Sequence, residues 1–257
     1  MRYSALAPGK RLRPYLVLAS NRLIGAGEQE AWVAAAAVEC VHAFSLIHDD
    51  LPAMDDDDLR RGRPACHKRF DEATAILAGD ALLALAFELL AREIRDPSLA
   101  ARMSLALARA TGSCGMIGGQ MSDLEGERQP PSFDLTRAIH ERKTVALFRA
   151  ACELGGLAGR ASDPDLATLC RFGQMVGRAF QIADDLLDVS PAATEVGKRT
   201  GKDAAAGKQT YPQCVGQEQA RASADAAVEE AVAALEGFGP HADDLRALAR
   251  FIVARTR

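Results

Sequence analysis

The sequence has few aromatic residues and few stretches in which apolar and polar residues alternate. Aromatic side chains account for 5% of the 257 residues, whereas apolar residues as a whole account for 48%. Half-buried β-strands show the alternation that is nearly absent here, and strands are enriched in aromatic residues. Alanine is abundant instead, which favours closely packed helices over a β-sandwich.

Three further absences argue against other classes of protein. The six cysteines lie far apart with no CxxC pair, which argues against a disulfide framework or a zinc site and is typical of a reducing compartment. The net charge is −4 and no domain is basic, so we expect no nucleic acid as the main partner. No apolar run reaches about 18 residues, and the first residues lack the apolar core of a signal peptide. We therefore expect no membrane span and a cytoplasmic location.

Apolar residues recur at helical spacing along nearly the whole chain. The first predicted helix runs from residue 12 to about 25. The second, from residue 29 through AWVAAAAVECVHAFSLIHDD, is apolar almost all round and is therefore expected in the middle of a bundle. Further helices are predicted at about 70–95, 98–121, 132–158, 164–188, 210–236 and 240–256. We predict one all-α domain over residues 1–257, with the polar stretch 190–208 as a loop.

An acidic cluster follows directly on the apolar second helix. The segment HDDLPAMDDDDLRRG places six carboxylates within ten residues. Like charges this close repel one another, and their burial is costly unless a cation compensates them. A solvated acidic turn is the alternative interpretation. We consider it the weaker one, because solvated turns rarely follow immediately on a buried helix.

A second acidic cluster interrupts the otherwise apolar helix predicted at 164–188. It comprises Asp184, Asp185 and Asp188, of which the first and last share one helix face. No cationic residue follows within helical reach, so an ordinary intrahelical ion pair does not explain the cluster. Buried carboxylates on one face then indicate a bound cation. Hard oxygen ligands suit Mg²⁺ or Mn²⁺ rather than zinc, and the spacing is not that of a calcium-binding EF-hand. The two clusters therefore suggest magnesium ions that hold a diphosphate between facing helices.

Basic residues with phosphate-binding chemistry occur near both clusters. They are found in GKRLRP near the start, in Arg60-Arg61, in HERKT and in the late segment from Lys198 to Lys208. Arginine gives bidentate contacts to phosphate, and lysine gives a mobile point charge. A solvated surface position is the default for each of them taken singly. His42 on the apolar helix is either a core histidine or a phosphate ligand, and both interpretations stay open.

Six segments in this order resemble the bacterial short-chain isoprenyl diphosphate synthases of the farnesyl type, within the trans-polyprenyl synthetase family. The segments are GKRLRP, HDDLPAMDDDDLRRGRP, GGQMSD, HERKT, FQIADDLLD and GKQTYP. The resemblance covers the whole chain. It implies an all-α, single-domain helical bundle around a central cavity, acting as a homodimer. Members usually carry at least one more helix before GKRLRP, which begins here at residue 9. We expect this difference to concern solubility, part of the dimer contact and activity, and to leave the named site residues unchanged.

The resemblance also implies an activity. It implies the condensation of isopentenyl diphosphate with an allylic diphosphate, dimethylallyl or geranyl, to give farnesyl diphosphate, with Mg²⁺ as cofactor and Mn²⁺ as a possible substitute. Its implied metal ligands are Asp49, Asp50, Asp55, Asp184, Asp185 and Asp188. Its implied contacts to isopentenyl diphosphate are Lys10, Arg13, His42 and Arg61.

The resemblance also implies which residues contact the allylic diphosphate and the developing cation. They are Arg60, Lys143, Thr144, Gln181, Lys198 and Lys208. Catalysis is then implied to rest on Asp49, Asp55, Arg60, Lys143, Thr144, Gln181, Asp184 and Lys198, with the 190–208 loop excluding water. Product length is implied to depend on Phe44 and Ser45, shortly before the first aspartate pair. Simple core filling by Phe44 is the alternative.

Other functions of the same fold stay open at this point. A geranyl or geranylgeranyl diphosphate synthase would differ only in product length. A terpene cyclase would share the metal chemistry, but it would leave the GKRLRP and Arg61 set without a role and usually has a different second metal motif. A non-catalytic regulatory subunit would have no need for two intact acidic motifs.

Overall fold

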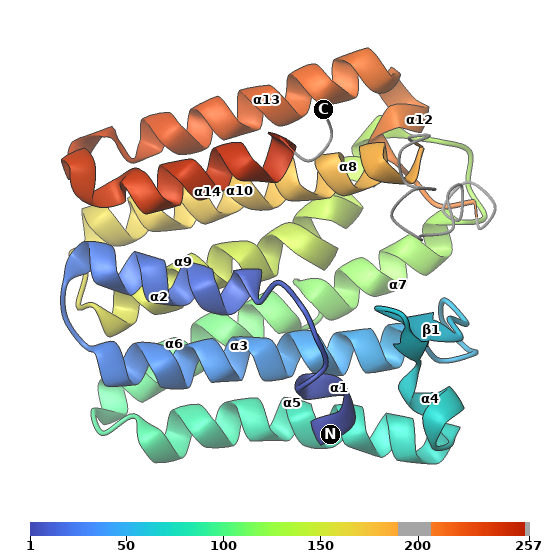
Figure 1. The fold of residues 1–257 in the computed structure, drawn as a ribbon, viewed down its shortest axis with the longest axis horizontal. Helices are drawn as coiled ribbons and strands as arrows, with labels where there is room; N and C mark the ends of the chain where they lie inside the picture. Colours follow the sequence, from blue (N-terminus) through green and yellow to red (C-terminus); the bar gives the residue numbers. More distant parts are fainter. Residues whose placement is uncertain (190–206, 255–257) are drawn as a thin grey trace.

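The computed structural model describes residues 1–189 and 207–254. They form an all-α bundle, which confirms the predicted fold class (Figure 1). The first half contains α1 (Arg2–Ala5), α2 (Leu12–Ile24), α3 (Glu28–Asp49), α4 (Cys66–Arg69), α5 (Glu72–Glu93) and α6 (Pro97–Thr111). A two-stranded hairpin of β1 (Leu59–Arg60) and β2 (Arg63–Pro64) lies between α3 and α4.

The second half begins with α7 (Met116–Gly126) and α8 (Phe133–His140). A π-helical turn, η1 (Glu141–Val145), joins α8 to α9 (Ala146–Ala158). The last described elements are α10 (Asp163–Asp188), α12 (Tyr211–Val215), α13 (Gln217–Ala234), the 3₁₀ segment η3 (Glu236–Ala242) and α14 (Asp243–Ala254).

The helices begin where short polar side chains can cap them. Asp71 accepts a hydrogen bond from the backbone N of Thr74 at the start of α5, and Asp96 accepts one from that of Ser98 at the start of α6. Ser162 does the same for α10. Each contact satisfies a backbone N–H that the first helical turn leaves without a partner. In α6 and α10 a proline follows the cap within the first two helical positions, where it has no intrahelical N–H to lose.

Two segments that are predicted as single helices each form two helices in the structure. The helix expected over 98–121 is divided into α6 and α7 between Gly112 and Gly115. A Cβ at Gly115 would lie 2.2 Å from the carbonyl oxygen of Ala110, so this close turn excludes any larger residue. The helix expected over 210–236 is divided at Gly216, which has a left-handed φ of +83°. In both places the chain uses glycine to change direction within an otherwise helical pattern.

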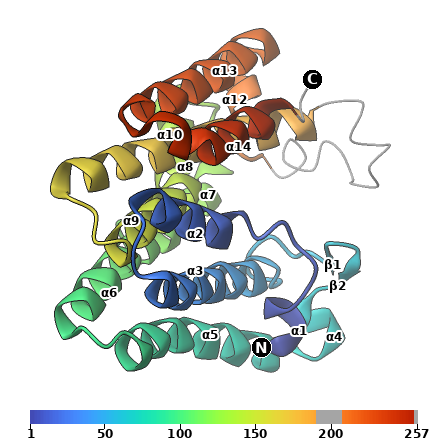
Figure 2. The same cartoon turned by 60° about the vertical axis from the view of Figure 1, so that its left-hand side comes forward.

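Helix α3 lies in the middle of the bundle, as predicted from its composition, and packs against α2, α5 and α9 (Figures 1 and 2). Ala34, Ala37, Val38 and Val41 have no exposed surface. By length and composition alone, α3 and α5 could each cross a membrane. This is weak evidence for a span, because core helices of soluble proteins pass the same test. It nevertheless departs from the expectation that no segment is apolar enough.

The direction of the helices places both acidic clusters at one end of the bundle. Helices α3 and α10 run the same way, and their C-terminal ends lie at the right-hand side of Figure 1 together with the β1–β2 hairpin. The first acidic cluster begins at the end of α3, and the second occupies the last turns of α10. The arrangement of helices therefore brings together segments that are more than 120 residues apart in the sequence.

Candidate active site

The first acidic motif folds back onto the end of α3. The backbone N of Asp55 donates to the carbonyl oxygen of Asp49 at 2.9 Å, and that of Asp57 donates to the carbonyl oxygen of Asp50 at 3.2 Å. These bonds satisfy the last carbonyls of the helix and bring Asp55 beside Asp49. Burial raises the pKa of Asp49 to about 6; Asp55 adds to the rise, and Lys143 opposes it. An acid so perturbed within a cluster of charges is typical of a functional site.

The hairpin returns Arg60 to this motif. Its two central residues, Arg61 and Gly62, both have positive φ, at +54° and +74°, which is the geometry of a type I′ turn. Arg60 Nε then donates to Asp50 Oδ1 at 2.8 Å, and Arg60 Nη2 contacts the same oxygen. Asp50 is 2% exposed, and its burial raises its pKa despite the arginine. Arg60 therefore neutralises the most buried carboxylate of the motif.

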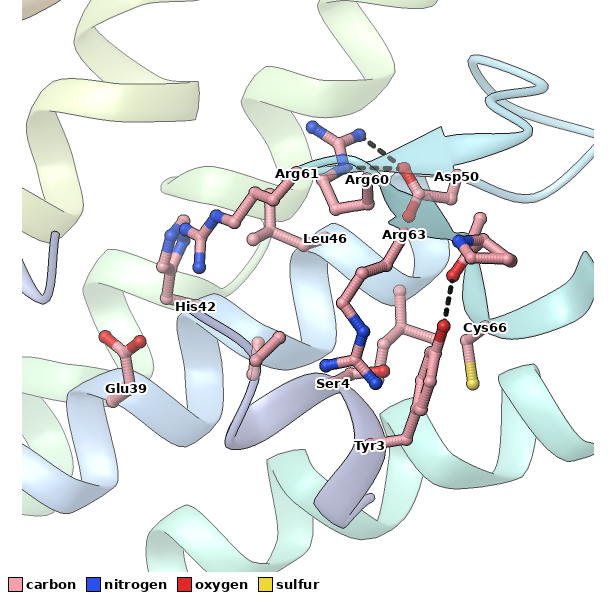
Figure 3. A pocket seen from close by; sticks show the side chains of 15 residues that line it. Tyr3, Ser4, Glu39, His42, Leu46, Asp50, Arg60, Arg61, Arg63 and Cys66 are labelled. Carbon is pink, nitrogen blue, oxygen red and sulfur yellow. Dashed lines mark hydrogen bonds and ion pairs between the residues drawn. The ribbon is translucent and has the colours of Figure 1, made fainter. Parts of the chain in front are cut away.

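A basic pocket lies next to the hairpin, between α1 and α3 (Figure 3). It is open to solvent and is lined by His42, Arg60 and Arg61 among others. Burial lowers the pKa of His42 well below its usual value, and the positive charges of Arg13, Arg61, Arg60 and Arg11 lower it further. His42 is therefore a neutral imidazole surrounded by guanidinium groups. This charge distribution suits an anion with several oxygens.

The GKRLRP segment supplies two of these arginines through an unusual backbone. Arg11 has a left-handed φ of +49° and pairs with Glu39 at 2.9 Å. Arg13 Nη1 lies 3.4 Å from His42 Nε2, and burial lowers the pKa of Arg13 to about 10. Gly9 leaves space for the side chains of Arg11 and Arg61, since a Cβ there would lie 2.1 Å from Arg61 Nη1. The predicted set for the second diphosphate is thus brought together, except that Lys10 is exposed.

Two lysines and one buried acid connect the first motif to the π-helical turn. Lys208 Nζ lies 2.8 Å from Asp55 Oδ1 and 3.0 Å from Asp123 Oδ2, and Lys143 Nζ lies 2.5 Å from the same Asp123 oxygen. Burial raises the pKa of Asp123, but the two ammonium groups outweigh it, so the pKa falls below its usual value. Burial lowers the pKa of Lys208, and its two acids outweigh that effect and raise it. Asp123 and Lys208 are therefore both charged at neutral pH.

Asp123 lies in the GGQMSD segment, but the sequence alone predicts no role for it. Only the structure shows that Asp123, 4% exposed on α7, faces both lysines. The contact depends on Gly119, whose Cβ would lie 2.2 Å from the backbone N of Lys143. The two adjacent glycines of the segment were the available signal, because such pairs mark close approach of two backbones.

The π-helical turn aims Thr144 at α10. Thr144 Oγ1 donates to Gln181 Oε1 at 2.7 Å, and Gln181 Nε2 donates to Asp185 Oδ1 at 2.8 Å. Single π-helical turns inside α-helices are frequent at functional sites, since the extra residue redirects the side chains around it. The first and second acidic motifs are therefore joined through Lys208, Asp123, Lys143-Thr144 and Gln181.

Within the second motif, Asp185 differs from its neighbours. It is 3% exposed, and its second oxygen accepts from the backbone N of Tyr211 at 2.8 Å and lies 3.4 Å from His140 Nε2. Burial lowers the pKa of His140 to about 4, so the ring is neutral at pH 7. Asp184 and Asp188 are half-buried, and the charge of Asp184 acts on Arg13. The second motif therefore lies near the basic pocket as well.

The donor set fits a hard divalent cation. Asp49, Asp55, Asp184 and Asp188 are half-buried carboxylates that a cation can reach, and oxygen ligands of this kind suit Mg²⁺ or Mn²⁺. Both oxygens of Asp185 already accept hydrogen bonds from the protein. We therefore propose that Asp185 acts by positioning its neighbours rather than as a direct ligand.

Three predicted residues need separate mention. Phe44 is 5% exposed and packs edge-on against the His48 ring, with 5.4 Å between the ring centres. Ser45 Oγ donates to the carbonyl oxygen of His42 at 2.9 Å. Their roles in product length stay predictions. Lys198 and all but the last two residues of the predicted 190–208 loop lie outside the described residues.

Comparison with known proteins accounts for this arrangement. Residues 1–241 match the family model described as polyprenyl synthetase. The chain is 47% identical to the farnesyl diphosphate synthase of Escherichia coli over 264 residues, which cover 100% of this chain and 88% of that protein. The chain belongs to the polyprenyl synthetase family. This confirms the resemblance noted in the sequence.

Other members of the polyprenyl synthetase family differ in the product that they are named for. A chloroplastic geranylgeranyl pyrophosphate synthase of Arabidopsis thaliana is 45% identical, with 99% of this chain and 73% of that protein covered. Among solved structures, an FPP/GFPP synthase from Zymomonas mobilis has a TM-score of 0.87 at 43% identity and covers 98% of this chain and 86% of its own. A geranyltransferase from Legionella pneumophila has a TM-score of 0.88 at 35% identity, covering 99% and 85%.

Proposed function

We propose that this polyprenyl synthetase joins isopentenyl diphosphate to an allylic diphosphate, dimethylallyl or geranyl, and that it releases diphosphate and forms farnesyl diphosphate. The observation that carries this proposal is the presence of two neighbouring anion sites. One is the pocket of arginines around His42. The other is the group of lysines and acids that links the two aspartate motifs. A reaction between two diphosphates needs two such sites, whereas a cyclase needs one.

The two sites suit the two halves of the reaction. In the pocket, Arg13, His42 and Arg61 hold isopentenyl diphosphate by its phosphate oxygens. At the other site, Arg60, Lys143 and Lys208 stabilise the negative charge that builds on the departing diphosphate of the allylic substrate. A divalent cation held by the half-buried aspartates of both motifs supplies further positive charge to that leaving group.

The allylic cation left behind needs oxygen dipoles rather than nucleophiles. Thr144 and Gln181 are held in fixed positions by their mutual hydrogen bond and by Asp185, and the widened η1 turn carries Thr144 and Lys143. Their oxygens then stabilise positive charge as it develops, without rearranging at the moment of reaction. The double bond of isopentenyl diphosphate attacks the cation, and the released diphosphate accepts the proton that the product then loses.

The apolar surface of α5 and its neighbours supports a homodimer. Ile76 and Leu77 on α5 are 44% and 66% exposed, and Leu105 on α6 is 51% exposed. A contiguous apolar surface is typical of a subunit interface, and these three side chains are exposed on two helices that pack against each other. We propose that a second copy of the chain covers this surface.

A direct assay tests the proposed function. The protein is incubated with Mg²⁺, isopentenyl diphosphate and either dimethylallyl or geranyl diphosphate, and the products are dephosphorylated and identified by gas chromatography. We expect farnesol from both starters, and no product when a chelator removes the metal. Cyclic hydrocarbons from the allylic substrate alone would indicate a cyclase. The absence of any product would favour a regulatory subunit.

Substitution of Phe44 tests how product length is set. We expect Phe44→Ala to shift the main product from fifteen toward twenty carbons, because it removes a ring that packs near the end of α3, five residues before Asp49. Chain-length analysis of the dephosphorylated products measures the shift. Phe172→Ala, a buried phenylalanine in α10, serves as control for general loosening of the core. An identical product distribution in wild type and Phe44→Ala would leave Phe44 as core filler only.

A further inference from the structure

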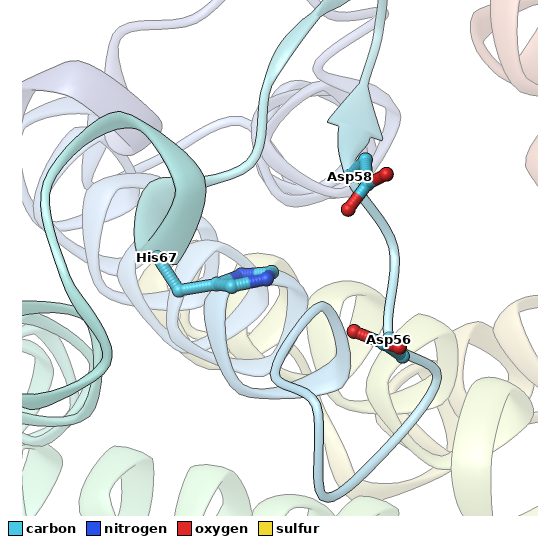
Figure 4. Close-up of side chains that lie close together, drawn as sticks. All are labelled: Asp56, Asp58 and His67. Atoms are coloured by element: carbon cyan, nitrogen blue, oxygen red, sulfur yellow. The ribbon is translucent and has the colours of Figure 1, made fainter.

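Three side chains converge at a place that the proposed reaction does not use. Asp56, Asp58 and His67 each offer a ligand atom, and these atoms lie within 4.8 Å of one another. In Figure 4 the His67 ring points toward the two carboxylates. None of the three belongs to the six aspartates predicted to hold the catalytic metal. The cluster lies in the segment that connects the first acidic motif to α4.

Local backbone structure creates the cluster. Asp56 has a left-handed φ of +48°, which turns the chain out of the acidic run. The β1–β2 hairpin then reverses the chain, and the backbone N of Ala65 donates to the carbonyl oxygen of Asp58 at 2.8 Å. Helix α4 starts at the next residue and carries His67. The positions of the three side chains are therefore fixed by the hairpin and not by a chance contact of surface loops.

His67 is the independent sign that this cluster has a ligand. The residue is 7% exposed, yet neither of its ring nitrogens has a hydrogen-bond partner among the described residues. Buried polar groups in native proteins nearly always have a partner, and a donor or acceptor without one destabilises the fold by about 1–3 kcal/mol. An imidazole that lacks a partner and faces two carboxylates has the surroundings of a metal ligand.

We infer that Asp56, Asp58 and His67 form a second divalent-cation site, separate from the diphosphate site. One imidazole nitrogen with two carboxylate oxygens suits Zn²⁺ or Co²⁺, whereas Mg²⁺ prefers oxygen ligands alone. Ligand atoms bonded to one such ion at about 2.0–2.2 Å lie at most about 4.4 Å apart. Asp56 and Asp58 are exposed and can close the remaining gap by rotating. The bound ion ties the segment after Asp55 to α4.

Lys68 competes with the cation for Asp58. Its ammonium group lies 2.9 Å from Asp58 Oδ1, and its side chain is 43% exposed. An ion pair this exposed is weak, so a divalent cation displaces the lysine readily. Removal of the Lys68 charge is therefore expected to strengthen cation binding at Asp58.

The test measures Co²⁺ binding by the metal-free protein in excess Mg²⁺, so that sites made of oxygen alone are filled. Co²⁺ is followed by its visible absorption and by equilibrium dialysis, and no substrate is present. We expect one tightly held Co²⁺ in the wild type, binding at least about tenfold weaker in His67→Gln and Asp58→Asn, and tighter binding in Lys68→Met. His241→Gln, an exposed histidine in η3, should bind Co²⁺ like the wild type.

Each alternative outcome decides against the site. Unchanged Co²⁺ binding in His67→Gln would assign the ion to the catalytic aspartates, and loss of binding in His241→Gln would assign it to surface histidines. No Co²⁺ retained by the wild type would also overturn the inference. Because the readout needs no prenyl transfer, a failure here is distinguishable from a failure of the proposed function.

Discussion

We expect Asp49→Asn to give a protein that is more stable without metal and has lost most of its activity. Burial raises the pKa of Asp49 from 3.8 to about 6, so the folded state disfavours the charged form. At neutral pH this difference corresponds to about 3 kcal/mol, which the neutral asparagine avoids. The same carboxylate is predicted to help bind the metal that stabilises the leaving diphosphate. We therefore expect kcat/KM to fall by about 10²- to 10³-fold or more.

The pH dependence of this effect has a defined sign. A group whose folded pKa is raised favours the folded state at low pH, and this contribution is lost as pH rises through the folded value of about 6. The stability gain of Asp49→Asn should therefore be full above pH 6 and should vanish below about pH 4. Thermal unfolding in a chelator at several pH values measures it.

A matched aspartate separates burial from charge in this experiment. Asp56 is exposed in the same acidic run, and in a chelator Asp56→Asn should change stability by less than about 0.5 kcal/mol. If Asp49→Asn is instead destabilised at neutral pH in a chelator, then Asp49 is held by favourable contacts and is not a carboxylate kept in place for a metal.

The sequence predicts the helices well because the apolar period of 3.6 residues is strong in nearly every segment. It fails where the pattern continues through a change of direction, as at Gly112 and Gly115, because an amphipathic pattern says nothing about the path of the axis. The π-helical turn is hidden for a similar reason. HERKTV has no helix-breaking residue, and the extra residue becomes visible only through the contact of Thr144 with Gln181.

At the site, the sequence identifies which residue types gather but not which atoms they use. Asp184 and Asp185 are adjacent and chemically identical, so the sequence predicts both of them equally as metal ligands. The helix turns Asp185 toward Tyr211 and Gln181, where both of its oxygens accept hydrogen bonds. The role of Asp123 depends on a lysine 85 residues away in the chain. Such pairings follow from tertiary packing and cannot be read from spacing along one helix.

We expect Asp123→Asn to be the most destabilising single change at the site. Asp123 is 4% exposed and neutralises Lys143 and Lys208 together. Without its charge, two ammonium groups stay close together, with Asp55 at 2.8 Å and the more distant Glu127 at 3.9 Å as the remaining acids on Lys208. Removal of one partner from a buried ion pair lowers the free energy of unfolding by about 3–5 kcal/mol. Denaturant unfolding measures this loss, and Glu125→Gln, an exposed acid on the same helix, is the control and should be near neutral.

Added diphosphate distinguishes a functional lysine pair from a structural one. If Lys143 and Lys208 bind the diphosphate of the substrate, inorganic diphosphate with Mg²⁺ restores the negative charge that Asp123→Asn removes. The rise in melting temperature on adding both should then be larger in Asp123→Asn than in the wild type. The double variant Asp123→Asn/Lys208→Met should lose less stability than the two single variants summed, by about 0.5–3 kcal/mol, because contacting residues are coupled. Additive losses together with an unchanged response to diphosphate would mean that Asp123 neither pairs with Lys208 in solution nor holds it for the substrate.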